Sequence, residues 1–207
     1  MKKGRFAVVV LSVALMLLAL PIAAQAAEVF RSQFRGQFAS ASFYQDDGCV
    51  FTNVYVAAGD GRVQAGPGQP EVNSAASLYI DQYDYCTATS LLSGYGFASL
   101  DAEAFQANQG LNSATLDATI WVYSWPSDES VPVDVHLTWA GAGSITRSSS
   151  HYRSTSRDFT YNTRYRATSR AAEATGTVVL DGMNLTPAPS GWAVITRDAV
   201  STVWIDR

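Results

Sequence analysis

The chain has 207 residues, of which 47% are hydrophobic and 15% are charged, and its formal net charge is −4. This length fits one domain with a substantial core, and the apolar content excludes an intrinsically disordered chain. The net acidity argues against general nucleic-acid binding, which requires a basic surface.

The first 26 residues have the pattern of a secretory signal peptide. Lys2 and Lys3 precede an apolar stretch over 6–20, and a segment of small residues then ends at Ala26. The apolar stretch is shorter than the ~20 residues that span a bilayer. We therefore expect cleavage after Ala26 and a secreted, extracellular domain over 27–207 that does not span the membrane. Removing the signal peptide removes three positive charges and no acid, so the charge becomes −4 − 3 = −7.

The first half of this domain predicts short strands separated by turns. Apolar and polar residues alternate, and the turn residues Asp46-Asp47-Gly48 and Gly59-Asp60-Gly61 interrupt the pattern. A Gly- and Pro-containing loop is expected over 65–70. The strands are predicted near 34–44, 49–57, 76–83 and 87–99.

A long hairpin is predicted in the middle of the domain. Alternating residues over 114–123 and 133–139 form its two strands, and a turn segment over 125–130 joins them. Downstream, Gly141-Ala142-Gly143-Ser144 is expected to be a loop, and Asp181-Gly182 a turn. Further strands are predicted near 144–153, 157–169, 172–181, 191–197 and 199–205.

Roughly ten strands at this spacing predict an all-β fold, an antiparallel β-sandwich or jelly roll. Strands that are apolar on one side and have aromatic ends also describe a small outer-membrane β-barrel. Several predicted strands are short for a barrel wall, which favours the sandwich.

Cys49 and Cys86 are the two cysteines of the chain. In an oxidising compartment they are expected to form a disulfide, which would close a loop of 36 intervening residues. The chain-entropy model makes such a bond worth about 4 kcal/mol.

The disulfide would bring four aspartates near one another, and oxygen-rich clusters of this kind can bind calcium in extracellular modules. A structural calcium ion is therefore one hypothesis. Aspartate is also a common turn residue, so a purely structural role is the alternative. The four candidate ligands are Asp46, Asp47, Asp81 and Asp84.

A basic segment lies inside this acidic chain: residues 147–173 contain six arginines and two acids, whereas 27–146 contain three arginines and 13 acids. Alternation along a strand predicts Arg164 and Arg166 on one face and aromatic side chains on the other, packed into the core. Such a cationic surface can bind an anionic cell-envelope polysaccharide or an acidic protein surface. Pairing of these arginines with acids on neighbouring strands is the alternative. The predicted binding residues are Arg153, Arg157, Arg164 and Arg166, with Arg147 and Arg170 nearby.

Nothing in the sequence marks a catalytic centre. The histidines, His136 and His151, lack the surroundings of a known nucleophile or metal motif, and no Gly-x-Ser-x-Gly or His-Glu-x-x-His motif is present. We therefore expect a non-catalytic domain that has a binding or surface role and no cofactor. A hydrolase of extracellular polymers is the alternative, because a carboxylate pair assembled by folding leaves no local spacing.

Residues 136–190 resemble a group of uncharacterised secreted bacterial proteins. The likeness rests on Thr138-Trp139-Ala140-Gly141-Ala142-Gly143 and on Arg170-Ala171-Ala172-Glu173-Ala174-Thr175-Gly176. It implies a free-standing secreted domain, and it assigns no activity or functional residue.

Overall fold

The computed structural model describes residues 29–125 and 127–206, and in these residues all secondary structure is β-strand, paired antiparallel. The signal peptide predicted over 1–26 lies outside the described residues. No helix long and apolar enough to cross a membrane is found among the described residues. The ten strands are β1 (Val29–Asp47), β2 (Val50–Ala65), β3 (Glu71–Asp84), β4 (Thr89–Ser99), β5 (Phe105–Ala107), β6 (Ser113–Trp125), β7 (Glu129–Thr155), β8 (Phe159–Leu180), β9 (Met183–Asn184) and β10 (Trp192–Asp206).

The strands form one curved sheet in the order β10-β1-β2-β3-β4-β6-β7-β8-β9, and β10 also pairs with β8. This last pairing closes the sheet into a ring. The predicted all-β, antiparallel fold of about ten strands is therefore confirmed, and its inward-facing residues come from opposite walls of one continuous sheet. The short β5 pairs with β6 outside this order.

The inside of the ring is the hydrophobic core. Trp139 of β7 is fully buried, and its indole nitrogen donates a hydrogen bond of 3.1 Å to the Ser40 carbonyl of β1 on another wall. The predicted hairpin is confirmed, since β6 pairs with β7 from Ser113↔Ala140 to Ser124↔Glu129. Its alternating apolar residues point into the core, which explains the strict polar-apolar pattern.

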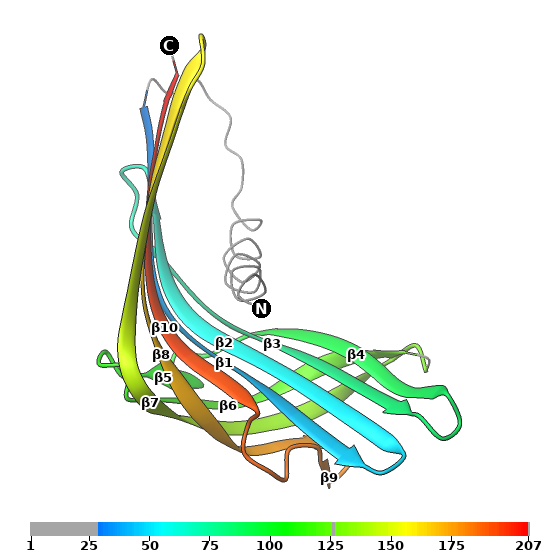
Figure 1. Cartoon of the computed structure of the whole chain (residues 1–207). Helices are drawn as coiled ribbons and strands as arrows, with labels where there is room; N and C mark the ends of the chain where they lie inside the picture. The colour runs from blue at the N-terminus through cyan, green and yellow to red at the C-terminus, as the bar shows by residue number, and fades with distance from the viewer. Residues whose placement is uncertain (1–28, 126, 207) are drawn as a thin grey trace.

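Strands β7, β8, β10, β1 and β2 continue beyond the ring as a single sheet. The molecule therefore has an upright part standing on a broad base (Figure 1). The β7–β8 hairpin, drawn in yellow, reaches the tip beside the ends of β1 and β10. We call this part the extension and define it by residues 29–37, 60–65, 142–170 and 196–206. The core cluster contains no residue of the extension.

The turn predicted at Gly59-Asp60-Gly61 is wrong, because β2 runs straight through it. A Cβ atom on Gly59 would lie 2.2 Å from the Phe38 ring, and one on Gly61 would lie 2.5 Å from the Phe34 ring. These glycines are therefore present because two phenylalanines of β1 pack against the β2 backbone.

Three further predicted breaks are wrong as well. The glycine segment after Ala140 is a bulge within β7, where the register against β8 shifts between Gly141 and Ile145. Strands β8 and β10 each run unbroken where two strands were predicted. The predicted turns at Gly48 and at Asp181-Gly182 are confirmed, and all three residues have positive φ angles.

Candidate functional site

The arginines of β8 alternate with aromatic residues as the sequence predicted. Arg164 and Arg166 share one face of the extension, while Tyr161 and Tyr165 lie on the other. In an antiparallel sheet, residues directly opposite each other point to the same side, so the register shows which other residues join each face.

The register places nine arginines on one face, which we call the arginine face. Five were identified from the sequence, and four come from β1, β2 and β10. Their position on this face depends on the strand pairing and could not be predicted from the sequence. The arginine face consists of Arg31, Arg35, Arg62, Arg147, Arg153, Arg164, Arg166, Arg170 and Arg197. The other arginine of the basic segment, Arg157, is exposed in the turn between β7 and β8 at the tip.

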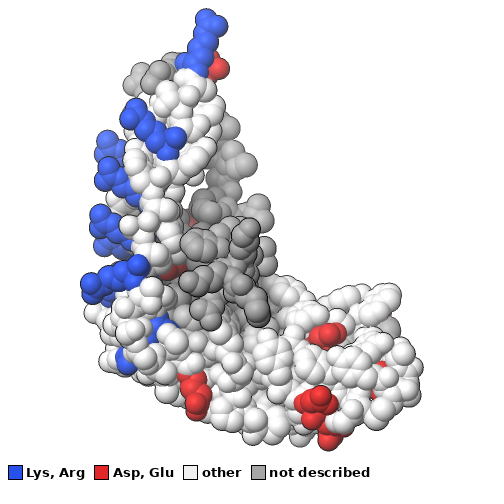
Figure 2. All heavy atoms as spheres, viewed as in Figure 1, with Lys and Arg blue, Asp and Glu red and all other residues white. Residues whose placement is uncertain are grey.

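The arginine face continues the inward face of the ring. Arg31 and Arg35 follow the same alternation as the core residues Ala39 and Ala41 of β1. Figure 2 shows the basic side chains along one side of the extension, whereas acidic side chains are scattered over the base.

None of the nine arginines takes part in a salt bridge found among the described residues. The salt bridge found in that part of the chain joins His136 and Asp117 on the outside of the ring. Its Nδ1 and carboxylate oxygen lie 3.0 Å apart. Arg35 lies directly opposite Arg62, so two like charges face each other across β1 and β2. Such a pair is destabilising, and it leaves the face open to an external anion.

At its lower end the arginine face is hollowed. Arg35, Arg62 and Arg197 line this hollow together with Asp60, an acid that the register places on the same face. Three guanidinium groups beside a single carboxylate leave a net positive charge, and each can offer two parallel N–H donors to an oxyanion.

Two arginines also bind the loop over 108–112, which contributes Gln109 to the hollow. Arg197 donates to the Gln109 carbonyl at 3.2 Å. Arg170 donates to the Gly143 carbonyl at 3.1 Å and to the side chain of Asn112. These bonds attach the 108–112 loop to β8 and β10, so the base of the arginine face is fixed in place.

The opposite face of the extension is aromatic, but it does not pack into the core as predicted. Phe34 and Phe38 lie 5.8 Å apart and cover Gly36, which is paired with Asp198 of β10. Asp198 is buried, and burial raises the pKa of its carboxyl to about 6. Burial, together with the nearby Asp198 charge, raises the pKa of Tyr165 to about 12.

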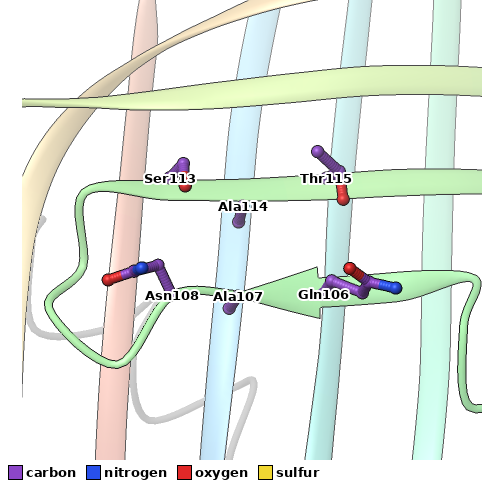
Figure 3. A pocket seen from close by; sticks show the side chains of 6 residues that line it. All are labelled: Gln106, Ala107, Asn108, Ser113, Ala114 and Thr115. Carbon is purple, nitrogen blue, oxygen red and sulfur yellow. The ribbon is translucent and has the colours of Figure 1, made fainter.

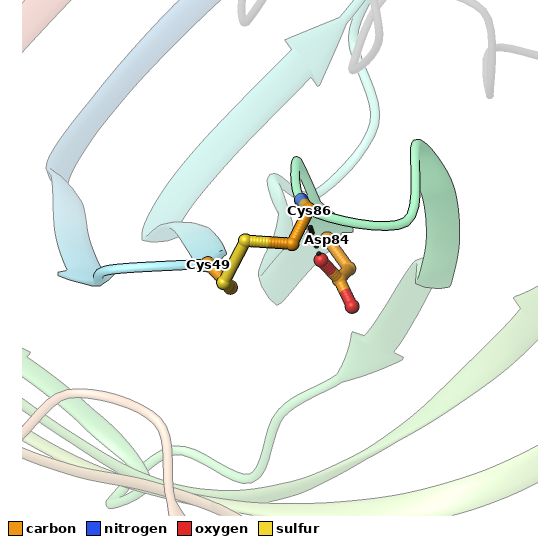
Figure 4. A group of neighbouring side chains, drawn as sticks. All are labelled: Cys49, Asp84 and Cys86. Carbon is orange, nitrogen blue, oxygen red and sulfur yellow. Dashed lines mark hydrogen bonds between the residues drawn. A yellow bond between two sulfur atoms is a disulfide. The ribbon is translucent and has the colours of Figure 1, made fainter.

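The disulfide between Cys49 and Cys86 is present, with a Cα–Cα distance of 5.3 Å (Figure 4). The four aspartates proposed as calcium ligands do not come together. Asp47 and Asp84 both pair with Val50 and share one face, whereas Asp46 and Asp81 lie on the other. Among the described residues, one group of potential metal-ligand atoms lies close together. It consists of the Asp84 carboxylate and the two sulfurs of the disulfide, and it includes none of the other three aspartates.

Two of these aspartates stabilise turns. The Asp46 carboxylate accepts a hydrogen bond from the Gly48 amide at 3.1 Å. Asp84 accepts bonds from the Cys86 amide, at 2.8 Å, and from Thr87. The Thr87 hydrogen bonds are the main reason why the pKa of Asp84 is lowered. A turn role accounts for both residues without a metal.

A second hollow lies between β5 and β6 (Figure 3). Its polar groups are the amides of Gln106 and Asn108 and the hydroxyls of Ser113 and Thr115. None of these side chains can exchange a proton near neutral pH, so this hollow has no general acid or base. His136 and His151 line neither of the two hollows.

No family model matches the sequence, and no curated protein matches it. Among solved structures, an acetoacetate decarboxylase-like enzyme from Sphingomonas wittichii RW1 is similar over 91% of this chain and 97% of its own, with 9% identity and a TM-score of 0.29. A putative AttH protein from Nitrosomonas europaea is similar over 91% of this chain and 56% of its own, with 10% identity and a TM-score of 0.25. These similarities are weak and assign no family.

Proposed function

We propose that the protein is an exported, non-catalytic binding domain whose arginine face binds an anionic polysaccharide of the cell envelope. The observation that carries this proposal is the gathering of nine arginines on one face of the extension, where no acid of the described residues forms a salt bridge with them. The secretory signal peptide predicted over 1–26 supports an extracellular ligand.

A polymer suits this face better than a small ligand. The arginines run from the hollow near Arg62 to Arg153 close to the tip, and they come from strands β1, β2, β7, β8 and β10. A chain that carries a carboxylate or phosphate on each unit can contact several guanidinium groups at once, and each bidentate contact is strong and directional. An isolated anion would bind at the hollow only.

The test compares two variants that carry the same charge. Arg164→Gln/Arg166→Gln removes two positive charges from the arginine face. Ser148→Glu/Ser150→Glu adds two negative charges to exposed positions on the opposite face of the same hairpin, at positions paired with Ala167 and Tyr165. Binding to polygalacturonate is measured by calorimetry at 50 mM and 300 mM NaCl, with neutral dextran as the reference polymer.

We expect the arginine variant to bind polygalacturonate at least tenfold more weakly than the wild type, and the serine variant to stay within threefold of it. Affinity should also fall at the higher salt concentration, because exposed charges are screened. Equal loss in both variants would mean that net charge alone matters and would defeat the proposal. So would tight binding that salt does not weaken.

A further inference from the structure

A row of tyrosines crosses the outside of the ring, far along the sheet from the arginine face. Tyr55, Tyr79, Tyr95 and Tyr123 lie directly opposite one another on β2, β3, β4 and β6. They point outward because the residues that alternate with them are in the core. With neighbouring strands 4.7–4.9 Å apart, the row is about 14 Å long.

More aromatic residues flank this row, and with its three exposed tyrosines, on β3, β4 and β6, they form a surface that we call the aromatic wall. Its members are 36% to 61% exposed. In the described part of the chain, none of them is in a ring-to-ring contact, so no other aromatic ring covers them. The aromatic wall consists of Tyr79, Tyr95, Phe97, Trp121, Tyr123 and Trp125.

The wall stands on a rigid support. The Tyr123 hydroxyl donates a hydrogen bond of 2.6 Å to the Asp128 carboxylate. Beneath the wall, Gly94 and Gly96 let β4 pack closely against β6, because a Cβ atom on Gly96 would lie 2.5 Å from the Trp121 carbonyl. The rings are therefore presented by paired strands, which lowers the entropy cost of ordering them in a complex.

Hydroxyl groups lie between the rings. Ser77 is paired with Phe97, Ser93 with Trp125, and Ser130 with Tyr123. This mixture of rigid aromatic rings and small hydroxyl donors suits a ligand that is apolar on one side and rich in hydroxyls at its edge.

The charges around the wall select among such ligands. Among the described residues no arginine lies on it. The acids at its border are Asp81, Asp117, Asp128 and Asp134, and His136 lies 3.0 Å from the Asp117 carboxylate. An anionic polymer or an anionic lipid surface would be repelled by these acids. Two walls facing each other would also bring the same acids together.

We propose that the aromatic wall binds a neutral polysaccharide, at a site separate from the arginine face. A pyranose ring carries C–H groups on its faces and hydroxyls around its edge, so its faces stack on the aromatic rings while its hydroxyls bond to tyrosine and serine. A row of rings across the three strands β3, β4 and β6 lets successive sugar units of one chain bind side by side. The protein then holds a neutral and an anionic polymer at two places on one sheet.

The experiment is affinity electrophoresis of the full chain in native gels that contain hydroxyethyl cellulose, soluble starch or dextran. The test variant is Tyr95→Thr/Trp121→Thr/Trp125→Thr, since threonine keeps strand propensity while removing the rings. Tyr85→Thr/Tyr152→Thr is the matched control, because both residues are exposed aromatics outside the wall. Melting temperatures establish that each variant is folded, and Trp125→Thr alone replaces the triple variant if that one unfolds.

We expect at least one neutral polymer to retard the wild type, a loss of affinity of tenfold or more in the wall variant, and less than a twofold change in the control. Arg164→Gln/Arg166→Gln should also stay within twofold, which separates this proposal from that for the arginine face. The proposal is overturned if no neutral polymer retards the wild type or if the wall variant binds normally. It is also overturned if the wall variant instead loses binding to phosphatidylcholine vesicles or loses self-association.

Discussion

The ring and the extension are built from the same strands, yet they are stabilised in different ways. In the ring, opposite walls enclose a core in which residues such as Trp139 and Val135 are fully buried. The extension contributes no residue to that core, and it rests on hydrogen bonds between strands and on small aromatic clusters, such as Phe159 stacked on Trp204 at 4.8 Å. A strand can thus continue well beyond the core that stabilises it, and the residues beyond the core are available for binding.

The largest expected effect of a single substitution lies in the ring. Trp139→Ala should lower the free energy of unfolding by about 3–5 kcal/mol, because it leaves a cavity in the core and removes the hydrogen bond to Ser40. Trp204→Ala in the extension, where the ring is 41% exposed, should cost only about 1–2 kcal/mol. Urea unfolding followed by circular dichroism measures both values. Equal losses would contradict the distinction between a packed ring and an unpacked extension.

A smaller effect of opposite sign is expected in the extension at Asp198. Its pKa of about 6 in the folded protein is above the usual value of about 3.9 for the unfolded chain. Between these values the folded state keeps a proton that the unfolded state releases, so stability falls as pH rises through this window. At about one pH unit above this pKa the loss is complete and amounts to about 2–3 kcal/mol.

Asp198→Asn should therefore increase the free energy of unfolding by about 1–3 kcal/mol at pH 7.5, and this gain should disappear by about pH 3.5. Urea titrations across this pH range measure it, and Glu71→Gln, at an exposed position on β3, is the control. A gain that persists unchanged at pH 3.5 would show that ionisation of Asp198 is not its cause.

The smallest effect is expected from the facing arginines. Arg62→Gln removes the repulsion with Arg35 and should raise the free energy of unfolding by a few tenths of a kcal/mol in 20 mM salt. In 0.5 M salt the difference should vanish, because screening weakens the repulsion in the wild type as well. Thermal unfolding at the two salt concentrations measures this, and Arg153→Gln, opposite Asn162, is the control. A gain that is independent of salt would point to a cause other than charge.

The sequence predicted the features that depend on near neighbours in the chain. The alternation on β6 and β7, the turn at Gly48 and the pairing of the two cysteines were all predicted correctly. The roles of Gly59 and Gly61 were missed because they depend on phenylalanines of another strand. A closed sheet was weighed only as the β-barrel alternative, because nothing local signals the pairing of β8 with β10.

The candidate site divides in the same way. Arg164 and Arg166 were predicted from alternation within one strand. Arg35 and Arg62 join them only through the register of β1 with β2 and β10, across more than 100 residues of sequence. Each of these arginines has the alternation that places it on this face of its own strand. Which strands lie side by side became clear only from the strand order. The resemblance of residues 136–190 to secreted bacterial proteins stays a prediction.

The unequal lengths of β6 and β7 leave part of β7 at the border of the sheet. Pairing with β6 ends at Ala140, so among the described residues the segment over 145–155 pairs with β8 alone. No described strand pairs with its other side, and a strand of another molecule could add to such an edge. The segment carries Arg147, His151 and Arg153 and many serines, and its bulge lies at its beginning. Charge and bulges are the usual protection of such an edge, so Arg147 and Arg153, which we propose as ligand-binding residues, would also guard the protein against aggregation.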